Sequence, residues 1–324
     1  MTSTLEAIRG LVSSELDQAN ILIKESIASD IPLAKAIADH IIQSPGKQVR
    51  PMLVLLSAKA CGVLDQKAIT VAAIIELLHT ATLLHDDVID ESKQRRGRPT
   101  ANASFGNEAS VLVGDLLYSR AFQLIASLKH HRFTEIIAKG SSDIVEGEVL
   151  QLMHCHDPAT QEATYIDIVK RKTGVLFEIA AISGPILADA SLETQEAMRT
   201  YGQNLGAAFQ MLDDALDYEG DPELTGKNLG DDLQEGKPTL PLIYVMQQGA
   251  NHFRTTIAQA IKNPEQADLA QIQKILNETQ ALTYCKELAA QTIHIGMDQL
   301  NTLPDSASKT ALEALANFVI ERQQ

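Results

Sequence analysis

The sequence predicts an all-α fold, and both composition and periodicity point to it. Among 324 residues, 4% are aromatic, Trp does not occur, and Ala, Leu, Ile, Gln and Glu are abundant, a bias toward good helix formers. Nearly every segment between Gly or Pro residues has apolar positions three or four apart, whereas strict alternation is rare. An all-helical chain of this length can bury a single core, so we expect one domain over residues 1–324, a helical bundle that needs no strands.

The predicted helices follow one another along the chain, separated by short breaks. Their approximate ranges are 5–28, 33–43, 52–60, 67–86, 108–128, 133–154, 162–186, 193–216 and 240–248, followed by shorter helices as far as Glu321. Predicted N-caps are Asp30, Ser191 and Asp305, and predicted stops are Gly62, Gly140 and Gly249. Two polar segments, residues 91–105 and 218–238, are long enough to be functional loops.

Charge and composition exclude several classes of protein. The chain has 27 basic and 42 acidic residues, a formal charge of −15, which is the wrong sign for neutralising a nucleic-acid backbone. The longest apolar region, residues 52–84, contains several charged side chains, so stable membrane insertion is not expected. No secretory signal is evident at the start, and the three cysteines lack a metal-type spacing. We therefore expect a cytoplasmic protein.

Two acidic clusters end long apolar helices and lead into the two polar segments. The first contains Asp86, Asp87 and Asp90, and the second contains Asp213, Asp214 and Asp217. Residues four apart share a helix face, so like charges gather at a helix C-terminus, where they are unfavourable unless a cation is bound. Carboxylates of this kind suit Mg²⁺ together with a diphosphate. A single cluster could equally be a solvated helix end, but two matching clusters are harder to ascribe to chance.

Basic residues lie close to these clusters in the sequence. They are Lys47 and Arg50 before a helix, Arg95 and Arg96 after the first cluster, Lys172 beside Thr173, and Lys227 and Lys237 after the second cluster. Arg can grip phosphate oxygens with two hydrogen bonds, and Lys acts as a point charge. Any one of them could be an ordinary surface charge, but together they indicate a site for an anionic substrate.

Between residues 46 and 241 the sequence resembles the trans-type prenyl diphosphate synthases, in particular their long-chain bacterial members. The resemblance rests on GKQVRP, HTATLLHDDVIDESKQRRG, EGEVLQL, KTGVLF, FQMLDDALDY and GKNLGDDLQEGKPTLP. It implies an isoprenoid synthase fold, with helices around a deep central cavity, and a homodimer. It also implies a reaction in which an allylic diphosphate ionises and isopentenyl diphosphate attacks the carbocation, repeated to give a long chain. The implied primer is farnesyl diphosphate, and the implied product is octaprenyl diphosphate for a quinone side chain.

The same resemblance implies roles for individual residues. Asp86, Asp90 and Asp213 would coordinate three Mg²⁺ ions, with Asp87, Asp214 and Asp217 completing the motifs. The leaving diphosphate would be held by Arg95, Lys172, Lys227 and Lys237, and isopentenyl diphosphate by Lys47, Arg50, His79 and Arg96. Thr173 and Gln210 would lie near the carbocation, with Phe209 beside them. One departure is visible, because Pro45 and Gln48 stand where the family commonly has Gly and Arg.

Product length is predicted from the helix that ends in the first cluster. Thr82 lies one turn before Asp86 and Ala81 beside it, and Leu78 continues the same wall. In the resembled family a bulky aromatic residue at these places stops growth early, so small residues imply an open tunnel and a long product. Phe122 and Leu124 on a neighbouring helix are candidates for the tunnel floor, together with Ala121 and Ile125. Without the resemblance, ordinary core packing would be the better explanation of these residues.

Three other interpretations remain open from the sequence. One is the same chemistry with a different product length, another is a class I terpene cyclase, and a third is a regulatory subunit of a heteromeric synthase. The five-residue form of the second cluster and the presence of both clusters favour the synthase. The string His154-Cys155-His156-Asp157 falls short of the usual zinc spacing and is predicted to be a loop.

Overall fold

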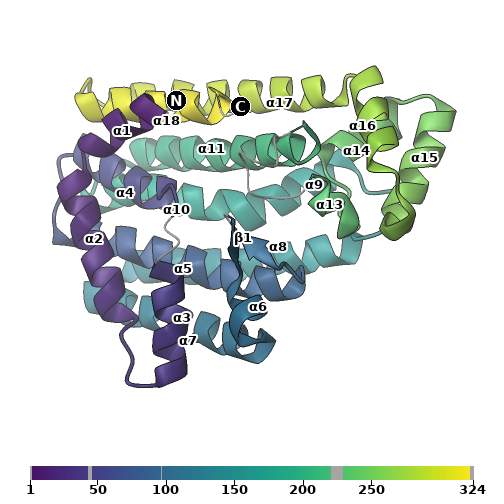
Figure 1. The fold of residues 1–324 in the computed structure, drawn as a ribbon. Coiled ribbons are helices and arrows are strands. Elements are labelled where there is room, and N and C mark those ends of the chain that lie inside the picture. Colours follow the sequence, from purple (N-terminus) through teal and green to yellow (C-terminus); the bar gives the residue numbers. More distant parts are fainter. Residues whose placement is uncertain (1, 43–45, 96, 220–228, 322–324) are drawn as a thin grey trace.

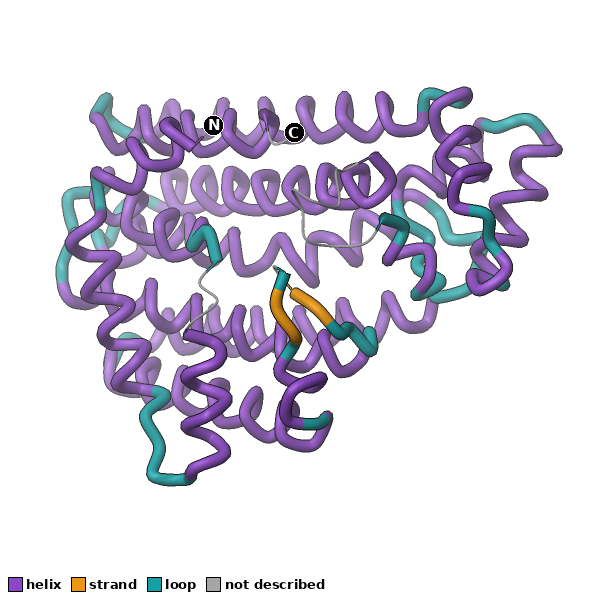
Figure 2. Tube along the Cα trace, viewed as in Figure 1, coloured by secondary structure: helices purple, strands orange, loops and turns teal. Residues whose placement is uncertain are grey.

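The computed structural model describes residues 2–42, 46–95, 97–219 and 229–321, and helices make up most of it (Figure 2). From the N-terminus the helices are α1 (Thr2–Gly10), α2 (Ser13–Ser26), α3 (Pro32–Ile42), α4 (Val49–Ala60), α5 (Gln66–Ile89), α6 (Ala101–Phe105), α7 (Asn107–Leu128), α8 (His131–His154), α9 (Glu162–Val169), the π-helical turn η1 (Lys170–Gly174), α10 (Val175–Leu187) and α11 (Leu192–Glu219). They continue with α13 (Asp231–Gln234), α14 (Leu240–Gln248), α15 (Asn251–Lys262), η2 (Pro264–Gln266), α16 (Leu269–Glu278), α17 (Ala281–Asp298), η3 (Gln299–Thr302) and α18 (Ala307–Glu321). The predicted all-α class is confirmed.

The long helices lie in successive layers (Figure 1). Helices α17 and α18 form one outer layer and pack on α11, which packs on α10, and α10 packs on α4 and α5. Helix α7 covers the opposite side of α5, and α1 to α3 close one end of the bundle while α14 to α16 close the other. The buried apolar side chains form one continuous core that extends from Ile8 to Val319. Such a core is what a single domain requires, and the single domain over residues 1–324 stays a prediction.

Helix α5 is the most enclosed of the long helices and carries the first acidic cluster at its end. Its side chains at Ile74, Ile75, Leu78 and Ala81 are 0–1% exposed, because α4, α7, α10 and α2 all pack against it. Asp65 caps its N-terminus, where the carboxylate accepts the backbone N–H groups of residues 67 and 68, which satisfies two otherwise unpaired donors.

The expectation that no strands are needed is wrong in one place. Residues Gln94–Arg95 (β1) and Arg98–Pro99 (β2) pair as an antiparallel hairpin, which lies beside α6 (Figures 1 and 2). Gly97 in its turn has a φ of +71°, the left-handed conformation that tight hairpin turns require. Strands of two residues are too short to show an alternating pattern, so periodicity could not reveal them.

Several predicted helix boundaries also need correction. The helix predicted over 5–28 is two helices, since the chain turns at Leu11 and Val12 between α1 and α2. Gly140 does not stop a helix but lies buried within α8. At the start of α18, Ser306 rather than Asp305 accepts the N–H of Lys309. The segments predicted as loops, 91–105 and 218–238, contain the hairpin with α6 and the short helix α13.

Two helices, α5 and α7, are long and apolar enough to cross a membrane by length and composition alone. In α5, 61% of the most apolar window is buried inside the fold, and in α7 the corresponding share is 33%. The core helix of a soluble protein passes the same test when it is mostly buried, so this finding is weak evidence for a span.

Close packing between α10 and α4 leads to a stability prediction. A Cβ atom at Gly184 would lie 2.3 Å from the carbonyl carbon of Ser57, which forces the two helices apart. We expect Gly184→Ala to lower the free energy of unfolding by about 1–3 kcal/mol, the usual cost of overpacking. Gly10→Ala is the control, because no atom lies within 4 Å of the added Cβ, and it should change stability by less than about 0.5 kcal/mol. Denaturant unfolding of both variants measures the difference, and equal effects would contradict the packing argument.

Candidate active site

An ion pair joins the end of α5 to a distant segment of the chain. Asp86 and Asp87 lie in the last turn of α5, and Asp90 is the residue that ends it. The Nζ atom of Lys237 lies 2.9 Å from Oδ1 of Asp90, although 147 positions separate the two residues, and it also contacts Glu235. The structure therefore brings the first acidic cluster next to the segment that follows the second one.

The ion pair keeps Lys237 charged in spite of its burial. Burial alone lowers the pKa of Lys237, but the carboxylates of Asp90, Glu235 and Asp232 raise it by more, so the net pKa lies above its usual value. Burial also raises the pKa of Glu235 to about 7, against the lowering effect of Lys237. The positive charge of Lys237 thus stabilises acidic groups that the fold has removed from water.

Asp86 lies in a site where negative charge is only partly offset. Burial is the largest influence and raises the pKa of its carboxyl group to about 7, with further raising by Glu148 and Asp90. Lys172 and Arg95 lower the same pKa. A cation bound here would stabilise the ionised carboxylate, so both the oxygen donors and their electrostatic surroundings fit a divalent metal ion.

The second acidic cluster lies on α11, where Asp214 is held by hydrogen bonds from its own protein. Asp214 is 2% exposed. Its Oδ1 accepts a hydrogen bond from Nε2 of Gln210 at 2.7 Å, and its Oδ2 accepts one from the hydroxyl of Tyr165 at 2.6 Å. The Oε1 of Gln210 in turn accepts the hydroxyl of Thr173 at 2.9 Å. A continuous chain of hydrogen bonds therefore runs from α9 through α11 to the π-helical turn η1.

Burial of Asp214 is the main reason for its altered titration. Burial and the neighbouring carboxylates of Asp232 and Asp213 raise its pKa to about 8, while the hydrogen bonds from Tyr165 and Gln210 lower it. Asp217, on the next turn of α11, accepts the backbone N–H of Asp232 at 3.3 Å. The second cluster is therefore linked to the polar segment that carries Lys237.

The turn η1 presents Lys172 and Thr173 to the site. It has π-helical hydrogen bonding between α9 and α10, and single π-helical turns of this kind are frequent at functional sites. The Nζ atom of Lys172 lies 2.7 Å from Oε1 of Glu148 and 2.9 Å from Oε1 of Gln151, both on α8. This places a cation beside the carboxylate of Asp86, whose pKa it lowers.

Arg95 holds the hairpin against the end of α5. Its Nε and NH2 atoms lie 2.9 Å and 2.8 Å from Oδ1 of Asp87, and Asp87 is 4% exposed. Asn102 on α6 also donates to the backbone carbonyl of Asp87 at 3.0 Å. Asp87 therefore anchors the segment after α5, a role that differs from direct contact with a substrate.

Three of the residues predicted for isopentenyl diphosphate, Lys47, Arg50 and His79, lie at or beside the start of α4. Arg50 donates from NH1 to Nε2 of His79 at 3.2 Å, and its guanidinium lies 4.4 Å from the ring centre of Phe177. Phe209 packs near Phe177, with ring centres 5.6 Å apart. The Nζ of Lys47 lies 5.7 Å from the ring centre of Phe318. Arg50 and His79, from α4 and α5, are thus in direct contact.

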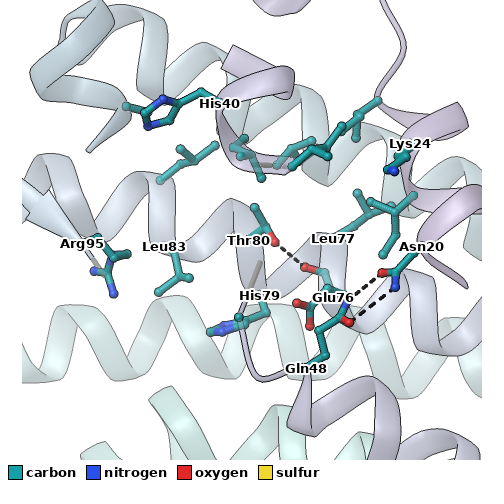
Figure 3. Close-up of a pocket in the computed structure, with 18 of the residues that line it drawn as sticks. Asn20, Lys24, His40, Gln48, Glu76, Leu77, His79, Thr80, Leu83 and Arg95 are labelled. Carbon is teal, nitrogen blue, oxygen red and sulfur yellow. Dashed lines mark hydrogen bonds between the residues drawn. The ribbon is translucent and has the colours of Figure 1, made fainter. Parts of the chain in front are cut away.

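A cavity of about 390 Å³ lies on the side of α5 that faces α2 and α3 (Figure 3). Its lining includes His79 and Arg95 from the predicted site and Gly46 and Gln48 from the segment before α4. Thr80 and Leu83 of α5 also line it. The cavity is therefore adjacent to the predicted isopentenyl diphosphate residues.

The tunnel residues have mixed environments. Leu78 and Ala81 are 1% and 0% exposed, whereas Phe122 on α7 is 42% exposed and Leu124 is half-buried against the core. The hydroxyl of Thr82 donates to the carbonyl of His79 at 2.8 Å. One chain by itself does not enclose a floor around Phe122, and the floor stays a prediction.

Two predicted site residues, Arg96 and Lys227, lie outside the described residues. Four side chains that the sequence reasoning did not single out belong to the site, namely Glu148, Gln151, Tyr165 and Glu235. Glu148 and Gln151 fall within the string EGEVLQL, one of those that carry the family resemblance, so the sequence could have identified them. The same holds for Glu235 in GKNLGDDLQEGKPTLP. Tyr165 gave no such signal, because its role depends on a contact that only the folded chain creates.

Among the described residues, no group of three or more His, Cys, Asp or Glu side chains converges closely enough to hold a metal ion alone. For the aspartates this finding matches the usual behaviour of Mg²⁺, which takes one or two protein carboxylates and completes its shell with water and phosphate oxygens. That the string from His154 to Asp157 is not a zinc site stays a prediction.

The buried hydrogen bond of Tyr165 generates a prediction. Tyr165→Phe leaves Oδ2 of Asp214 without its donor in a site closed to water, so we expect the free energy of unfolding to fall by about 1–3 kcal/mol. Tyr284→Phe is the matched control, because its hydroxyl donates to Glu162 at 2.9 Å in a half-buried position, where water can replace it. That variant should lose less than about 1 kcal/mol. Urea unfolding compares the two, and an equal loss would show that burial of Asp214 is unimportant.

Comparison with known proteins agrees with this geometry. Octaprenyl diphosphate synthase of Escherichia coli (strain K12) is 42% identical over 321 residues, covering 99% of each chain. All-trans-nonaprenyl-diphosphate synthase (geranyl-diphosphate specific) of Rhodobacter capsulatus is also 42% identical, covering 97% of this chain and 96% of the relative. The crystal structure of a polyprenyl synthase from Caulobacter crescentus, complexed with calcium and isoprenyl diphosphate, superposes with a TM-score of 0.95 at 38% identity, covering 99% of this chain and 98% of that one.

The family itself is identified by a match that spans most of the chain. Residues 31–279 match the polyprenyl synthetase family, and this range contains both acidic clusters, the lysines Lys172 and Lys237, and the residues around Arg50. Together with the relatives that match along nearly the whole length, this shows that the chain belongs to the polyprenyl synthetase family.

Proposed function

We propose that this chain, a trans-prenyltransferase, adds isopentenyl diphosphate repeatedly to farnesyl diphosphate and releases all-trans octaprenyl diphosphate. The observation that carries the proposal is the position of two lysines, from distant segments of the chain, beside the first acidic cluster. Lys237 joins Asp90 across 147 positions, and Lys172 lies near Asp86. Cationic and carboxylate side chains thus lie close together at one site. Such a site suits a substrate whose diphosphate is first bound and then released as an anion.

In this proposal the chain's own residues bind and orient two diphosphates. Lys172, Lys237 and Arg95, with Lys227, hold the allylic diphosphate, and Lys172 is itself oriented by Glu148 and Gln151. Lys47, Arg50, His79 and Arg96 hold isopentenyl diphosphate. The oxygens of Thr173 and Gln210, connected by a hydrogen bond of 2.9 Å, face the allylic carbon that becomes positive. No covalent nucleophile is needed.

Three Mg²⁺ ions are proposed as the cofactor, held by Asp86, Asp90 and Asp213 with help from Asp217. When bound, Mg²⁺ stabilises the negative charge on the departing diphosphate. Asp87 and Asp214 are assigned a supporting part, because Arg95 holds the first and Tyr165 and Gln210 hold the second. The Caulobacter relative was solved with calcium, a divalent ion with the same preference for oxygen ligands.

The long product is supported by the length of α5 on the N-terminal side of Asp86, the part of the helix that would line the product tunnel. From Gln66 to Asp86 this helix spans roughly 30 Å at 1.5 Å per residue. Ala81 is small, and the hydroxyl of Thr82 is turned back to the carbonyl of His79, so neither side chain blocks the wall. A chain of many isoprene units fits a length of this order, whereas a short product does not use it.

A different product length is the main alternative. The octaprenyl and nonaprenyl synthases share the same 42% identity with this chain, so similarity does not select between them. A class I terpene cyclase and a regulatory subunit are less well supported, because this chain has both acidic clusters and the basic residues for isopentenyl diphosphate. We also propose that the enzyme works in the cytoplasm and supplies a quinone side chain.

The assay uses purified protein with Mg²⁺, farnesyl diphosphate and labelled isopentenyl diphosphate, and separates the dephosphorylated alcohols by length. We expect one dominant alcohol of eight isoprene units, and no product when the metal is removed with EDTA. Another discrete length would keep the chemistry and reject the octaprenyl assignment. Absence of elongation by folded protein would reject the proposed function.

The tunnel wall is tested by adding bulk on one face of α5. We expect Ala81→Phe to shorten the dominant product by several units, since a ring at this position blocks growth below Asp86. Thr80→Phe is the control, because Thr80 lines the cavity of about 390 Å³ on another face of the same helix. It should leave product length unchanged. If both variants shorten the product equally, Ala81 does not line the product tunnel.

A homodimer is supported by exposed apolar side chains on α7 and α8. They are Val111, Leu112 and Phe122 on α7, and Val145, Val149, Leu152 and Met153 on α8. Leu112 and Leu152 are 67% and 66% exposed, and apolar surface of this extent on neighbouring elements is typical of an interface. A second copy of the chain is the proposed occupant of this face.

The dimer is tested by placing charge on that face. We expect Leu112→Glu and Leu152→Glu to shift the protein from dimer to monomer in light scattering coupled to gel filtration, because a buried unpaired carboxylate opposes association. Leu192→Glu is the control, since Leu192 is 73% exposed at the start of α11, away from α7 and α8. Dimers that persist in both test variants would place the interface elsewhere.

A further inference from the structure

Gln48 is one of two residues at which this chain departs from the family pattern, and it lies between Lys47 and Arg50. It precedes α4, with a φ of 54° and a ψ of 38°. This is the left-handed conformation, which costs a residue with a side chain of the order of 1 kcal/mol or more. Such a conformation persists only where surrounding contacts hold it.

The side chain of Gln48 forms hydrogen bonds with Arg9 of α1 and with Asn20 of α2, and Figure 3 shows its contact with Asn20. Its Nε2 donates to Oδ1 of Asn20 on α2 at 2.6 Å. Its Oε1 accepts Nδ2 of Asn20 at 3.4 Å and NH2 of Arg9 on α1 at 3.3 Å. The amide group of Gln48 therefore makes a reciprocal pair with Asn20, and Arg9 adds a charged donor to the same oxygen.

The backbone of Gln48 connects this contact to the start of α4. The carbonyl of Gln48 accepts the N–H of Met52 at 3.1 Å, which begins the helix, and Arg50 lies within the first turn. Arg50 is held from the other side by His79 and by the ring of Phe177. The segment that carries the two cations is thus fixed between the N-terminal helices and the core.

We propose that the Asn20–Gln48 pair, supported by Arg9, is a positioning contact that sets Lys47 and Arg50 for isopentenyl diphosphate. The inference rests on the proposed function, because it assigns the pair to one substrate of that reaction. Neither Asn20 nor Gln48 is a catalytic residue in this proposal. They act through the backbone between the two cations, whereas the allylic diphosphate is held by Lys172 and Lys237 elsewhere.

The proposal predicts that the two substrates respond differently to loss of the contact. Cations that are displaced by a fraction of an ångström lose well-aligned bonds to phosphate. We expect Gln48→Ala and Asn20→Ala to raise KM for isopentenyl diphosphate about tenfold, equivalent to ~1.4 kcal/mol. KM for farnesyl diphosphate and kcat should stay within about twofold. Because both variants break the same contact, the double variant should also raise KM about tenfold rather than a hundredfold.

Two further variants separate positioning from backbone strain and from loss of folding. Gln48→Gly removes the strain of the left-handed conformation but still lacks the amide, so its unfolding midpoint should exceed that of Gln48→Ala while KM stays high. Asn20→Asp keeps the oxygen that accepts the 2.6 Å bond but loses the donor of the 3.4 Å bond, so we expect KM to rise less than in Asn20→Ala. Gln18→Ala, at an exposed site on the same helix, is the control for changes to α2.

The experiment measures steady-state kinetics for each substrate, together with denaturant unfolding of every variant. A parent-like KM in Gln48→Gly, equal changes in both KM values, or a double variant whose effects multiply would overturn the proposal. If the parent chain fails to elongate any primer, the proposed function fails, and the contact is then judged by unfolding alone. Non-additive midpoint shifts of the two single variants would still support the Asn20–Gln48 contact, and additive shifts would overturn it.

Discussion

The burial of negative charge between helices is the constraint on which the rest of this structure depends. Asp87, Asp214 and Lys237 are nearly excluded from water, and charged groups in such places are stable only when partners compensate them. Lys237 compensates Asp90, Glu235 and Asp232, and Lys172 compensates Glu148. The pair of Lys237 with Asp90 joins the end of α5 to a segment 147 positions away, and the pair of Lys172 with Glu148 joins η1 to α8.

Close approach of the helices makes these pairings possible. A Cβ at Gly206 on α11 would lie 2.8 Å from the Cα of Gly174 in η1, so glycine is needed at this crossing. The contact brings Thr173 and Gln210 within hydrogen-bond distance, and the π-helical turn points Lys172 toward α8. The same few residues therefore determine both the helix packing and the arrangement of polar groups at the site. A bulkier side chain at this crossing would separate Thr173 from Gln210.

The fold class and the two acidic clusters could be predicted from local patterns in the sequence, whereas the roles of His79, Thr173 and Gln210 were implied only by the resemblance to a known family. Apolar spacing of three or four revealed the long helices, and acidic residues four apart revealed Asp86, Asp90, Asp213 and Asp217. The hairpin at Gln94–Pro99 escaped because two-residue strands have no periodicity. Tyr165 could not be predicted for a different reason. Its hydroxyl acts through a hydrogen bond to Asp214, which is 49 positions away in the sequence, and a contact between residues so far apart leaves no local pattern.

Consecutive aspartates in the two clusters have different surroundings, and helix geometry explains why. Adjacent residues on a helix point about 100° apart, so Asp86 and Asp87 cannot face the same neighbours, and the same holds for Asp213 and Asp214. Asp87 meets Arg95, and Asp214 meets Tyr165 and Gln210. A paired-aspartate motif therefore combines two tasks at one helix end. The second aspartate of each pair fixes a neighbouring segment, and the first faces a different side of the helix, where the proposal places the metal ions.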